Sequence, residues 1–222
     1  MAISGTRAGN LVVWIDYEPG IPAGIVATRV AATLDLPVID REITAQAAHR
    51  LGIPMQLASE LEVEPDHPVE RWLLAAAEGD QAVGLWGPTT AQSDPLLQPR
   101  AELMAAVRAA IQELLVPPCV IVGHEAGYIL EGQDDKTRVL LRAERSIRQR
   151  WLMDKPGRMG RRKSVAQLDR AKRTYVRQMF GRCWPEIASY ELIVDVTQHS
   201  WKATADVIAG FVAPGVADDW PA

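Results

Sequence analysis

The sequence predicts an α/β fold, a three-layer α/β/α arrangement in which helices cover both faces of a five-stranded parallel sheet. Two observations lead to this prediction. Short apolar runs rich in valine and isoleucine alternate along the chain with longer segments of helical periodicity. The apolar runs are bounded by glycine, proline or aspartate, which is typical of strands that end in turns. Because parallel strands need a crossover helix between them, this alternation favours a parallel sheet.

Five apolar runs are predicted to be strands. The first covers residues 11–15, is rich in β-branched side chains and ends at the turn-forming sequence Asp-Tyr-Glu-Pro-Gly. The other four are expected at residues 36–40, 117–123, 137–141 and 190–195. Ligands of such sheets lie beyond the carboxyl ends of the strands. The residues that follow each run are therefore the first candidates for a site.

Seven segments are predicted to be helices. The clearest covers residues 102–115, where Leu103, Val107 and Ile111 share one face. The full set is residues 21–34, 41–51, 69–78, 102–115, 144–153, 164–180 and 204–211. We expect short helical pieces joined by loops over 54–68, a long loop over 81–99, a helix break at 156–160 and a loosely ordered tail from 213.

The composition excludes several classes of protein. With 222 residues, 48% of them hydrophobic and 23% charged, the chain is neither disordered nor fibrous. No apolar run approaches the ~20 residues of a membrane span, and the first ten residues lack the apolar core of a signal peptide. Cys119 and Cys183 cannot build a disulfide framework, and no ligand spacing indicates zinc. We therefore expect a soluble, cytoplasmic protein.

The net charge of −4 hides a strong asymmetry. Between residues 136 and 182 there are sixteen Lys and Arg against three Asp and Glu, a local charge of +13, whereas the rest of the chain carries −17. A basic block on an acidic chain indicates a local anionic ligand. A solvated helical face would explain the same charges, so both interpretations stay open.

A glycine-containing loop follows the first strand. Gly20-Ile-Pro-Ala-Gly24 leads into a helix, and glycines beside a helix N-terminus allow close approach of an anion. A complete phosphate loop would read GxxxxGK[ST]. Here Ile25 follows Gly24, and the nearest hydroxyl group is that of Thr28. A plain strand-to-helix turn therefore remains the alternative.

Polar residues also follow the later strands. Asp40 and Arg41 come after the second strand and His124 comes after the third, where each could contact a polar ligand. The acid and base could equally pair with each other, and a lone histidine is often structural.

Arginines follow the fourth strand. Arg142, Arg145 and Arg148 recur at every third position, which places them on roughly one side of a helix. Guanidinium groups are suited to bidentate phosphate binding. With the break at 156–160 and the charged helix beyond it, this region is typical of a lid that closes over a polyphosphate.

Seven short segments follow one another along the chain: Leu34-Asp-Leu-Pro37, Ile39-Asp-Arg-Glu42, Val120-Ile-Val-Gly-His-Glu-Ala126, the stretch from Arg138 to Arg148, the stretch from Asp169 to Tyr175, Gly181-Arg-Cys-Trp184 and the stretch from Tyr190 to Thr197. In this order they resemble the cytidylate kinase-like family of P-loop nucleoside monophosphate kinases. The resemblance covers roughly residues 12–210 and is poor over 54–98.

The resemblance implies a P-loop NTPase-like fold with a helical lid, in one domain over 1–222. Residues 54–99 would be an acceptor-side insertion and 144–182 the basic lid. ATP and Mg²⁺ would be the cofactors and a nucleoside monophosphate or similar small acceptor the substrate. The donor phosphates would contact Gly20, Gly24 and Thr28. The acceptor nucleotide would contact Asp40, Arg41, His124, Asp169 and Arg173. The catalytic arginines of the lid would be Arg145, Arg148, Arg158, Arg161 and Arg162. No protein metal ligand is implied.

The chain departs from the family pattern at the phosphate loop. Pro22 removes an N–H donor, Ile25 replaces a basic residue, and Asp16 and Glu18 precede the loop. His124 stands where the family has arginine. Two hypotheses follow, a nucleotide-binding ATP-dependent phosphotransferase and a catalytically impaired nucleotide- or anion-binding regulatory protein.

Nucleic-acid binding by the basic block is the weakest of the three hypotheses that we weigh, because no nucleic-acid motif accompanies it. We expect a small-molecule nucleotide as partner and no membrane, and a homo-oligomer stays open.

Overall fold

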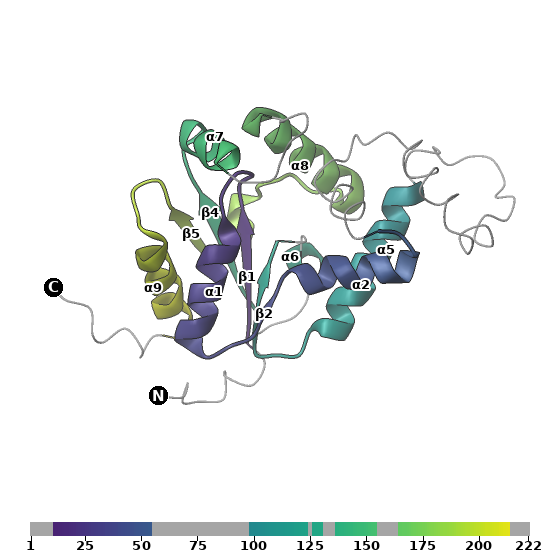
Figure 1. Cartoon of the computed structure of the whole chain (residues 1–222), viewed down its shortest axis with the longest axis horizontal. Helices are drawn as coiled ribbons and strands as arrows, with labels where there is room; N and C mark the ends of the chain where they lie inside the picture. The colour runs from purple at the N-terminus through teal and green to yellow at the C-terminus, as the bar shows by residue number, and fades with distance from the viewer. Residues whose placement is uncertain (1–10, 55–97, 124–125, 131–135, 155–163, 214–222) are drawn as a thin grey trace, which may run out of the picture. The chain divides into compact units, whose positions relative to one another are not determined.

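The computed structural model describes residues 11–54, 98–123, 126–130, 136–154 and 164–213 (Figure 1). A five-stranded sheet with the order β2-β3-β1-β4-β5 lies at its centre, and every pairing in it is parallel. The strands are β1 (Val12–Tyr17), β2 (Val38–Ile39), β3 (Cys119–Val122), β4 (Lys136–Arg142) and β5 (Leu192–Asp195). The predicted parallel α/β sheet is confirmed, and β1 lies in its middle.

Seven α-helices and one 3₁₀ turn lie in the described residues. They are α1 (Ala23–Leu34), α2 (Arg41–Leu51), α5 (Gln98–Leu114), α6 (Ala126–Ile129), α7 (Arg145–Met153), α8 (Val165–Phe180), α9 (Trp201–Val212) and the 3₁₀ turn Ile187–Ser189. Six of the predicted helices are confirmed, five of them with shifted ends. The predicted helix at 69–78, most of the loop at 81–99 and the break at 156–160 lie outside the described residues.

The chain divides into two compact units. The first comprises residues 1–40, 115–170 and 185–222, and the second comprises residues 41–114 and 171–184. The first unit contains the whole sheet with α1, α6, α7 and α9. The second contains α2, α5 and the larger part of α8. None of the described helices is long and apolar enough to cross a membrane.

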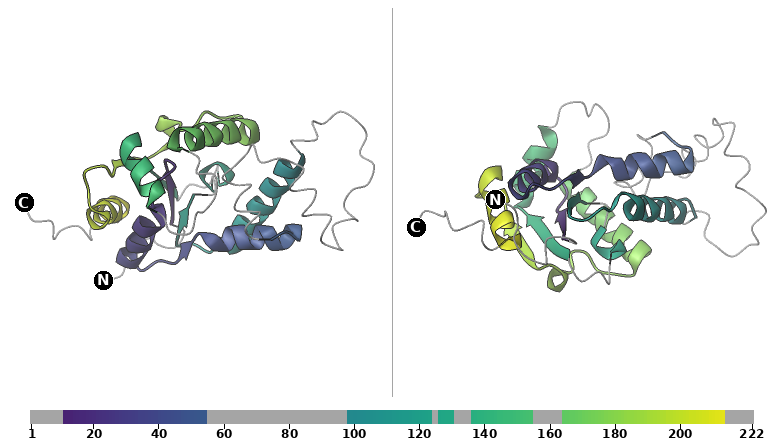
Figure 2. Two further views of the ribbon diagram at one scale, coloured as in Figure 1. Left: turned by 45° about the horizontal axis from the view of Figure 1, so that its top comes forward. Right: turned by 90° about the horizontal axis from the view of Figure 1, so that it is seen from below.

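One face of the sheet is covered by α1 and α9, which lie side by side (Figure 2). Val13 and Ile15 of β1 are fully buried in this core against Val26 and Val30 of α1 and Ile208 of α9. The segment of α1 forms a helix because it is rich in alanine and places its larger apolar residues on one side.

Helix α9 begins three residues before the predicted position. Ser200 is its N-cap, and the Oγ of Ser200 accepts a hydrogen bond from the N–H of Ala203 at 3.1 Å. The first helical residue, Trp201, packs against Trp151 of α7, with ring centroids 4.9 Å apart and planes tilted by 58°. This contact joins α7 to α9 within the first unit.

An aromatic cluster covers the opposite face of β1. The Trp14 ring stacks on Tyr190 at 5.7 Å and meets Tyr128 of α6 edge-on at 6.0 Å. The Trp14 Nε1–H donates to the Gly123 carbonyl oxygen at 2.9 Å. A Cβ atom at Gly127 would lie 1.9 Å from the Trp14 ring, so glycine is needed where α6 packs on the sheet. The helices on both faces give the predicted three layers.

In the second unit, α2 and α5 pack against each other. Their contact buries Ile43 and Ala47 of α2 and Val107 and Ile111 of α5. At the edge of the pair, Glu113 accepts hydrogen bonds from Arg50 and Gln46, and these bonds hold the pKa of the Glu113 carboxyl below its usual value.

Candidate nucleotide-site loop

The candidate site lies at the carboxyl end of β1, where the chain leaves the sheet and enters α1. The N–H of Glu18 donates to the Leu141 carbonyl oxygen at 3.0 Å, which extends the pairing of β1 with β4 by one residue. Gly20 has a φ of 101°, which an L side chain rarely adopts. A Cβ atom on Gly20 would lie 2.7 Å from the Arg148 carbonyl oxygen. The loop is therefore packed directly against α7.

Several backbone N–H groups of this loop are missing or used within it. Pro19 and Pro22 have no N–H. The N–H groups of Ile21 and Ala23 donate to carbonyl oxygens of the loop, at 3.2 and 2.9 Å. The N–H of Ile25 donates to the Pro22 carbonyl oxygen at 3.0 Å. A phosphate loop needs N–H groups that point toward the ligand, so these five residues offer an anion little.

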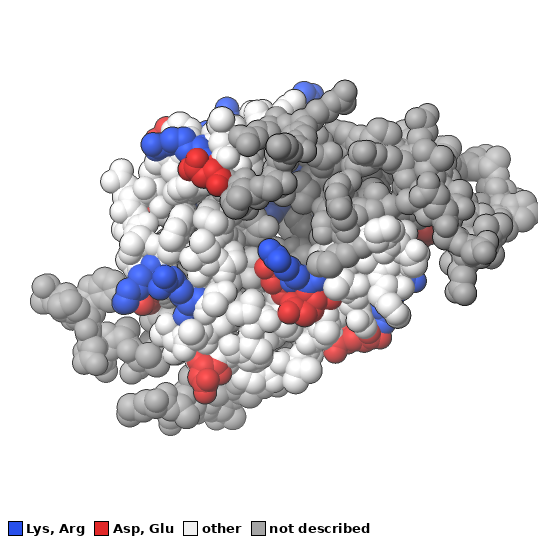
Figure 3. All heavy atoms as spheres, in the orientation of Figure 1, with Lys and Arg blue, Asp and Glu red and all other residues white. Residues whose placement is uncertain are grey.

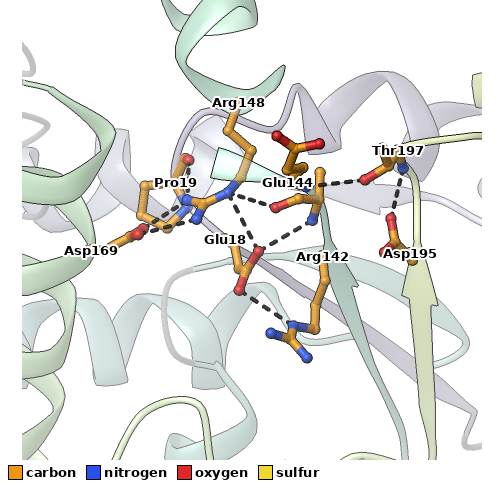
Figure 4. A network of polar contacts seen from close by, with 9 residues as sticks. Glu18, Pro19, Arg142, Glu144, Arg148, Asp169, Asp195 and Thr197 are labelled. Carbon is orange, nitrogen blue, oxygen red and sulfur yellow. Dashed lines mark hydrogen bonds and ion pairs between the residues drawn. The ribbon is translucent and has the colours of Figure 1, made fainter. Parts of the chain in front are cut away.

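The carboxylate of Glu18 points toward the end of β4 and the start of α7 (Figure 4). Its Oε2 accepts a hydrogen bond from the backbone N–H of Ala143 at 3.1 Å, and its Oε1 accepts one from Arg142 Nε at 3.3 Å. Arg148 Nε lies 3.4 Å from Oε2. Glu18 is buried, with 9% of its surface exposed. A negative charge inside the loop is thus held by one amide and two guanidinium groups.

Arg148 is buried at the centre of the same network. Its Nη1 and Nη2 donate to the two carboxylate oxygens of Asp169 at 2.7 and 3.1 Å, a bidentate pair. The same guanidinium donates to the carbonyl oxygens of Ala143 and Pro19 at 3.0 and 2.9 Å. Asp169 is also buried. Through these hydrogen bonds, Arg148 links the loop to α7 and to the first turns of α8.

A second polar link joins β5 to the start of α7. The N–H of Glu144 donates to Thr197 Oγ1 at 3.0 Å, and the N–H of Thr197 donates to Asp195 Oδ1 at 2.8 Å (Figure 4). Hydrogen bonds from Thr197 hold the pKa of the Asp195 carboxyl below its usual value, and the charge of Arg142 acts in the same direction.

Asp16 is a buried carboxylate on the face of β1 that carries the aromatic cluster. The Tyr190 hydroxyl donates to Asp16 Oδ2 at 2.6 Å, and the N–H of Tyr17 donates to Oδ1 at 2.8 Å. Burial raises the pKa of the Tyr190 phenol, and the negative charge of Asp16 raises it further. Tyr190 therefore stays a neutral hydrogen-bond donor to Asp16.

Comparison with known proteins identifies the protein family of this chain. A model of the family described as "Cytidylate kinase-like family" matches residues 12–198. The chain belongs to the cytidylate kinase-like family. It is accordingly a kinase-like protein of a nucleotide-binding family, and its resemblance to that family in sequence is confirmed.

Two solved structures show the same fold at low sequence identity, and a third is a weaker match. An uncharacterised protein from Eubacterium ventriosum is 14% identical, with a TM-score of 0.55 over 91% of this chain and 98% of that one. TT1252 from Thermus thermophilus is 17% identical, with a TM-score of 0.51 over 92% and 97%. A shikimate kinase from Bacteroides thetaiotaomicron is 11% identical, with a TM-score of 0.49 over 91% and 98%. A search of curated protein sequences gives no match.

Gly24 and Asp40, which the family resemblance assigns to nucleotide binding, lie close together. A Cβ atom on Gly24, in the first turn of α1, would lie 3.7 Å from Asp40 Oδ2, just after β2. The Thr28 hydroxyl donates to the Gly24 carbonyl oxygen at 2.8 Å and is thus bonded to its own helix. Gly20, Gly24 and Asp40 surround the amino end of α1, where the family resemblance expects nucleotide.

The remaining predicted site residues fall into three groups. Arg148 and Asp169 form the buried pair described above. Arg145 is exposed at the start of α7, and Arg41 and Arg173 are exposed on helices of the second unit. The other four, His124, Arg158, Arg161 and Arg162, lie outside the described residues.

Sequence reasoning placed Glu18 near the loop but missed its partners. Arg142 and Ala143 lie about 125 positions further along the chain, and they meet Glu18 because β4 is the direct neighbour of β1. A carboxylate that enters a buried loop needs cations. This requirement for a cationic partner, combined with the strand order, could have indicated Arg142 as a partner of Glu18.

The loop does not fit a polyphosphate with its magnesium ion. Glu18 places a negative charge at the loop, position 25 is isoleucine where the family has a basic residue, and the Thr28 hydroxyl is bonded within α1. Among the residues that the structure describes, no group of three or more His, Cys, Asp and Glu side chains could hold a metal ion. Charged side chains of both signs lie beside one another on the face shown in Figure 3.

Proposed function

We propose that the chain is a nucleotide-binding protein of the cytidylate kinase-like family in which phosphoryl transfer from ATP is strongly impaired. The observation that carries the proposal is the Glu18 carboxylate, which lies in the loop where the family resemblance expects the donor phosphates and is held there by Arg142, Arg148 and the Ala143 N–H. A negative charge at this place opposes the negative charge of a triphosphate.

The expected loss of rate supports the same proposal. Electrostatic contacts to a developing transition-state charge are each worth about 3 kcal/mol in enzymes that use them, or a hundredfold and more in rate. Arg148, which the family resemblance assigns to the lid, is buried against Asp169. Since the loop also lacks a basic residue at position 25, several contacts would be lost together.

The ligand that we propose is a nucleoside monophosphate or a similar small anion. Asp40 lies beside the first turn of α1, where its carboxylate could accept a hydrogen bond from a hydroxyl or amino group of a ligand. Arg145 is exposed at the start of α7, and a guanidinium there could pair with a phosphate. Arg41 and Arg173 are further candidates from the family resemblance.

An active ATP- and Mg²⁺-dependent phosphotransferase is the second candidate. It is favoured by the backbone of the loop, because Gly20 keeps a left-handed conformation and Gly24 lies in the first turn of α1. Under this candidate, Arg145 and the arginines at 158, 161 and 162 would neutralise the transferring phosphoryl group.

Isothermal titration of the purified chain tests the proposal. The ligands are ATP with and without Mg²⁺ and a panel of nucleoside monophosphates, and turnover is followed in the same samples. We expect a monophosphate to bind and no phosphoryl transfer above background. Arg145→Ala should weaken monophosphate binding, while Arg150→Ala, an exposed arginine of the same helix, should not.

Micromolar, Mg²⁺-dependent ATP binding with turnover would reject impairment and establish the phosphotransferase. Absence of binding by any nucleotide at millimolar concentration would reject both candidates.

A further inference from the structure

The contacts of Glu18 have the composition of an oxyanion site. The Ala143 N–H and Arg142 Nε donate to the Glu18 carboxylate at 3.1 and 3.3 Å, and Arg148, whose Nε–H is donated to the Ala143 carbonyl oxygen, forms an ion pair with Glu18 at 3.4 Å. Phosphate oxygens are bound in proteins by the same kinds of donor. We refer to Arg142, the Ala143 N–H and Arg148 as the donor set.

We propose that Glu18 acts as an internal anion that keeps phosphate groups out of the donor set, and that the donor set binds inorganic pyrophosphate once the charge of Glu18 is removed. Glu18 is then a specificity-determining residue of the loop. The inference rests on the proposed function, because it names the residue that excludes phosphate from this end of the sheet.

The charges of the network explain why an added anion is rejected. Arg142 and Arg148 carry two positive charges, and Glu18 and Asp169 carry two negative ones, so the four side chains together are neutral. Pyrophosphate would meet no net positive charge and would contact the Glu18 carboxylate. Removing the charge of Glu18 makes these surroundings more positive by one unit, whatever Asp195 contributes through its own interaction with Arg142. Water screens charges less here than in bulk.

The donor set can be reached from solvent. The Arg142 side chain is 49% exposed, whereas those of Glu18, Arg148 and Asp169 are 12%, 5% and 4% exposed. An anion would therefore enter beside Arg142, and Arg148 would stay fixed by its bidentate pair with Asp169. Because Asp169 and the Pro19 and Ala143 carbonyl oxygens already orient Arg148, this guanidinium is held in place before an anion arrives.

The test is isothermal titration with sodium pyrophosphate, at low ionic strength and without metal ions, of wild type, Glu18→Gln and Glu18→Ala. Glutamine keeps an oxygen that can accept from the Ala143 N–H, and two substitutions are used so that the test does not depend on one variant folding. We expect both variants to bind pyrophosphate about tenfold or more tightly than wild type. Adding salt should reduce the gain.

Three controls separate the donor set from a general change in charge. Glu144→Gln removes a neighbouring exposed carboxylate that accepts a hydrogen bond from the Ser146 hydroxyl, and it should give no gain. Glu18→Asp keeps the charge and should also give none. Arg142→Ala in the Glu18→Gln background should abolish the gain. Circular dichroism and thermal melting establish that each variant is folded.

The inference is overturned if folded Glu18→Gln and Glu18→Ala bind pyrophosphate within threefold of wild type, or if Glu144→Gln gains as much as they do. Failure of the proposed function is recognised separately, because it is ATP turnover by the wild-type chain or the absence of nucleotide binding to it. A gain in pyrophosphate binding with no nucleotide binding by wild type would support the inference and reject the proposed function.

Discussion

At the scale of the residue, Arg148 is buried and forms a bidentate pair with the Asp169 carboxylate. The spacing of arginines after the fourth strand predicts that Arg142, Arg145 and Arg148 share one side of a helix. In the structure Arg145 is exposed, whereas Arg148 is 4% exposed and bonded to Asp169. The sequence could predict the basic region, but it could not predict which arginine is buried, because that depends on a carboxylate 21 positions away.

Replacing Arg148 with alanine should destabilise the protein strongly. The substitution leaves the Asp169 carboxylate buried without its guanidinium partner, which typically costs about 3–5 kcal/mol in free energy of unfolding. Arg145→Ala, at an exposed position of the same helix, should change that free energy by no more than about 0.5 kcal/mol. Urea unfolding followed by circular dichroism measures both. A loss below about 1 kcal/mol for Arg148→Ala would contradict a buried, tightly bonded pair.

Glu191 should contribute to stability in a way that depends on pH. Burial raises the pKa of its carboxyl, but hydrogen bonds from Arg138 outweigh burial and hold the pKa below 4.5. Because the folded-state pKa is the lower one, the contribution is present above pH 4.5 and is lost as the pH falls through the folded-state value.

Glu191→Gln should therefore be less stable than wild type at pH 7, by about 1 kcal/mol or less because the side chain is partly exposed. The difference should shrink as the pH is lowered below 4.5. Urea unfolding at a series of pH values measures it. A difference that stays constant down to the acid transition would show that the hydrogen bonds from Arg138 contribute nothing.

At the scale of the elements, the helices and strands could be predicted closely because their patterns are local. All five strands lie at or within two residues of the predicted runs, and α2 has the predicted ends. Helix α6 was not predicted, since four residues are too few for a periodic pattern. Helix α9 starts early because the Ser200 side chain caps it. Serine is a favoured N-cap residue, so the residue type alone could have indicated this start.

Gly127→Ala should disturb α6 and the aromatic cluster. The added Cβ atom would overlap the Trp14 ring, 1.9 Å away, and Trp14 is itself fixed by its bond to Gly123 and by stacking on Tyr190. Overpacking of this kind costs about 1–3 kcal/mol, and more where neighbours cannot move. Thermal melting and tryptophan fluorescence report the change.

Gly24→Ala is the matched control for this prediction. Its Cβ atom would lie 3.7 Å from Asp40 Oδ2, an ordinary contact, and alanine is favourable in a helix. The variant should therefore melt close to wild type. Equal melting of wild type and Gly127→Ala would show that α6 does not pack on Trp14 as described.

At the scale of the whole molecule, the sequence predicts a parallel sheet but not the order of its strands. The order puts β1 between β3 and β4 and thereby brings Glu18 to Arg142, two residues that no local pattern relates. The division into two units also follows from contacts between distant segments, and the boundary within α8 has no sequence signal.

The central position of β1 predicts how hydrogen exchange varies across the sheet. Residues 12–15 pair with strands on both sides, residues 16 and 17 pair with β4, and the whole strand is almost completely buried, whereas β5 pairs on one side and has Ile193 exposed. Exchange monitored by mass spectrometry should therefore be slowest in peptides covering 12–17 and clearly faster in those covering 192–195. Similar rates in the two peptides would contradict the strand order.

The contact between Trp151 and Trp201 has an optical consequence. Two indole rings 4.9 Å apart and tilted by 58° have transition dipoles that couple, and coupled dipoles give paired bands of opposite sign in the ultraviolet circular dichroism spectrum. One ring belongs to α7, against which the loop at Gly20 packs, and the other to α9 on the sheet. A ligand that shifts α7 relative to α9 changes the distance or the angle between the rings and thereby alters these bands. The unlabelled protein thus contains its own reporter of movement at the candidate site.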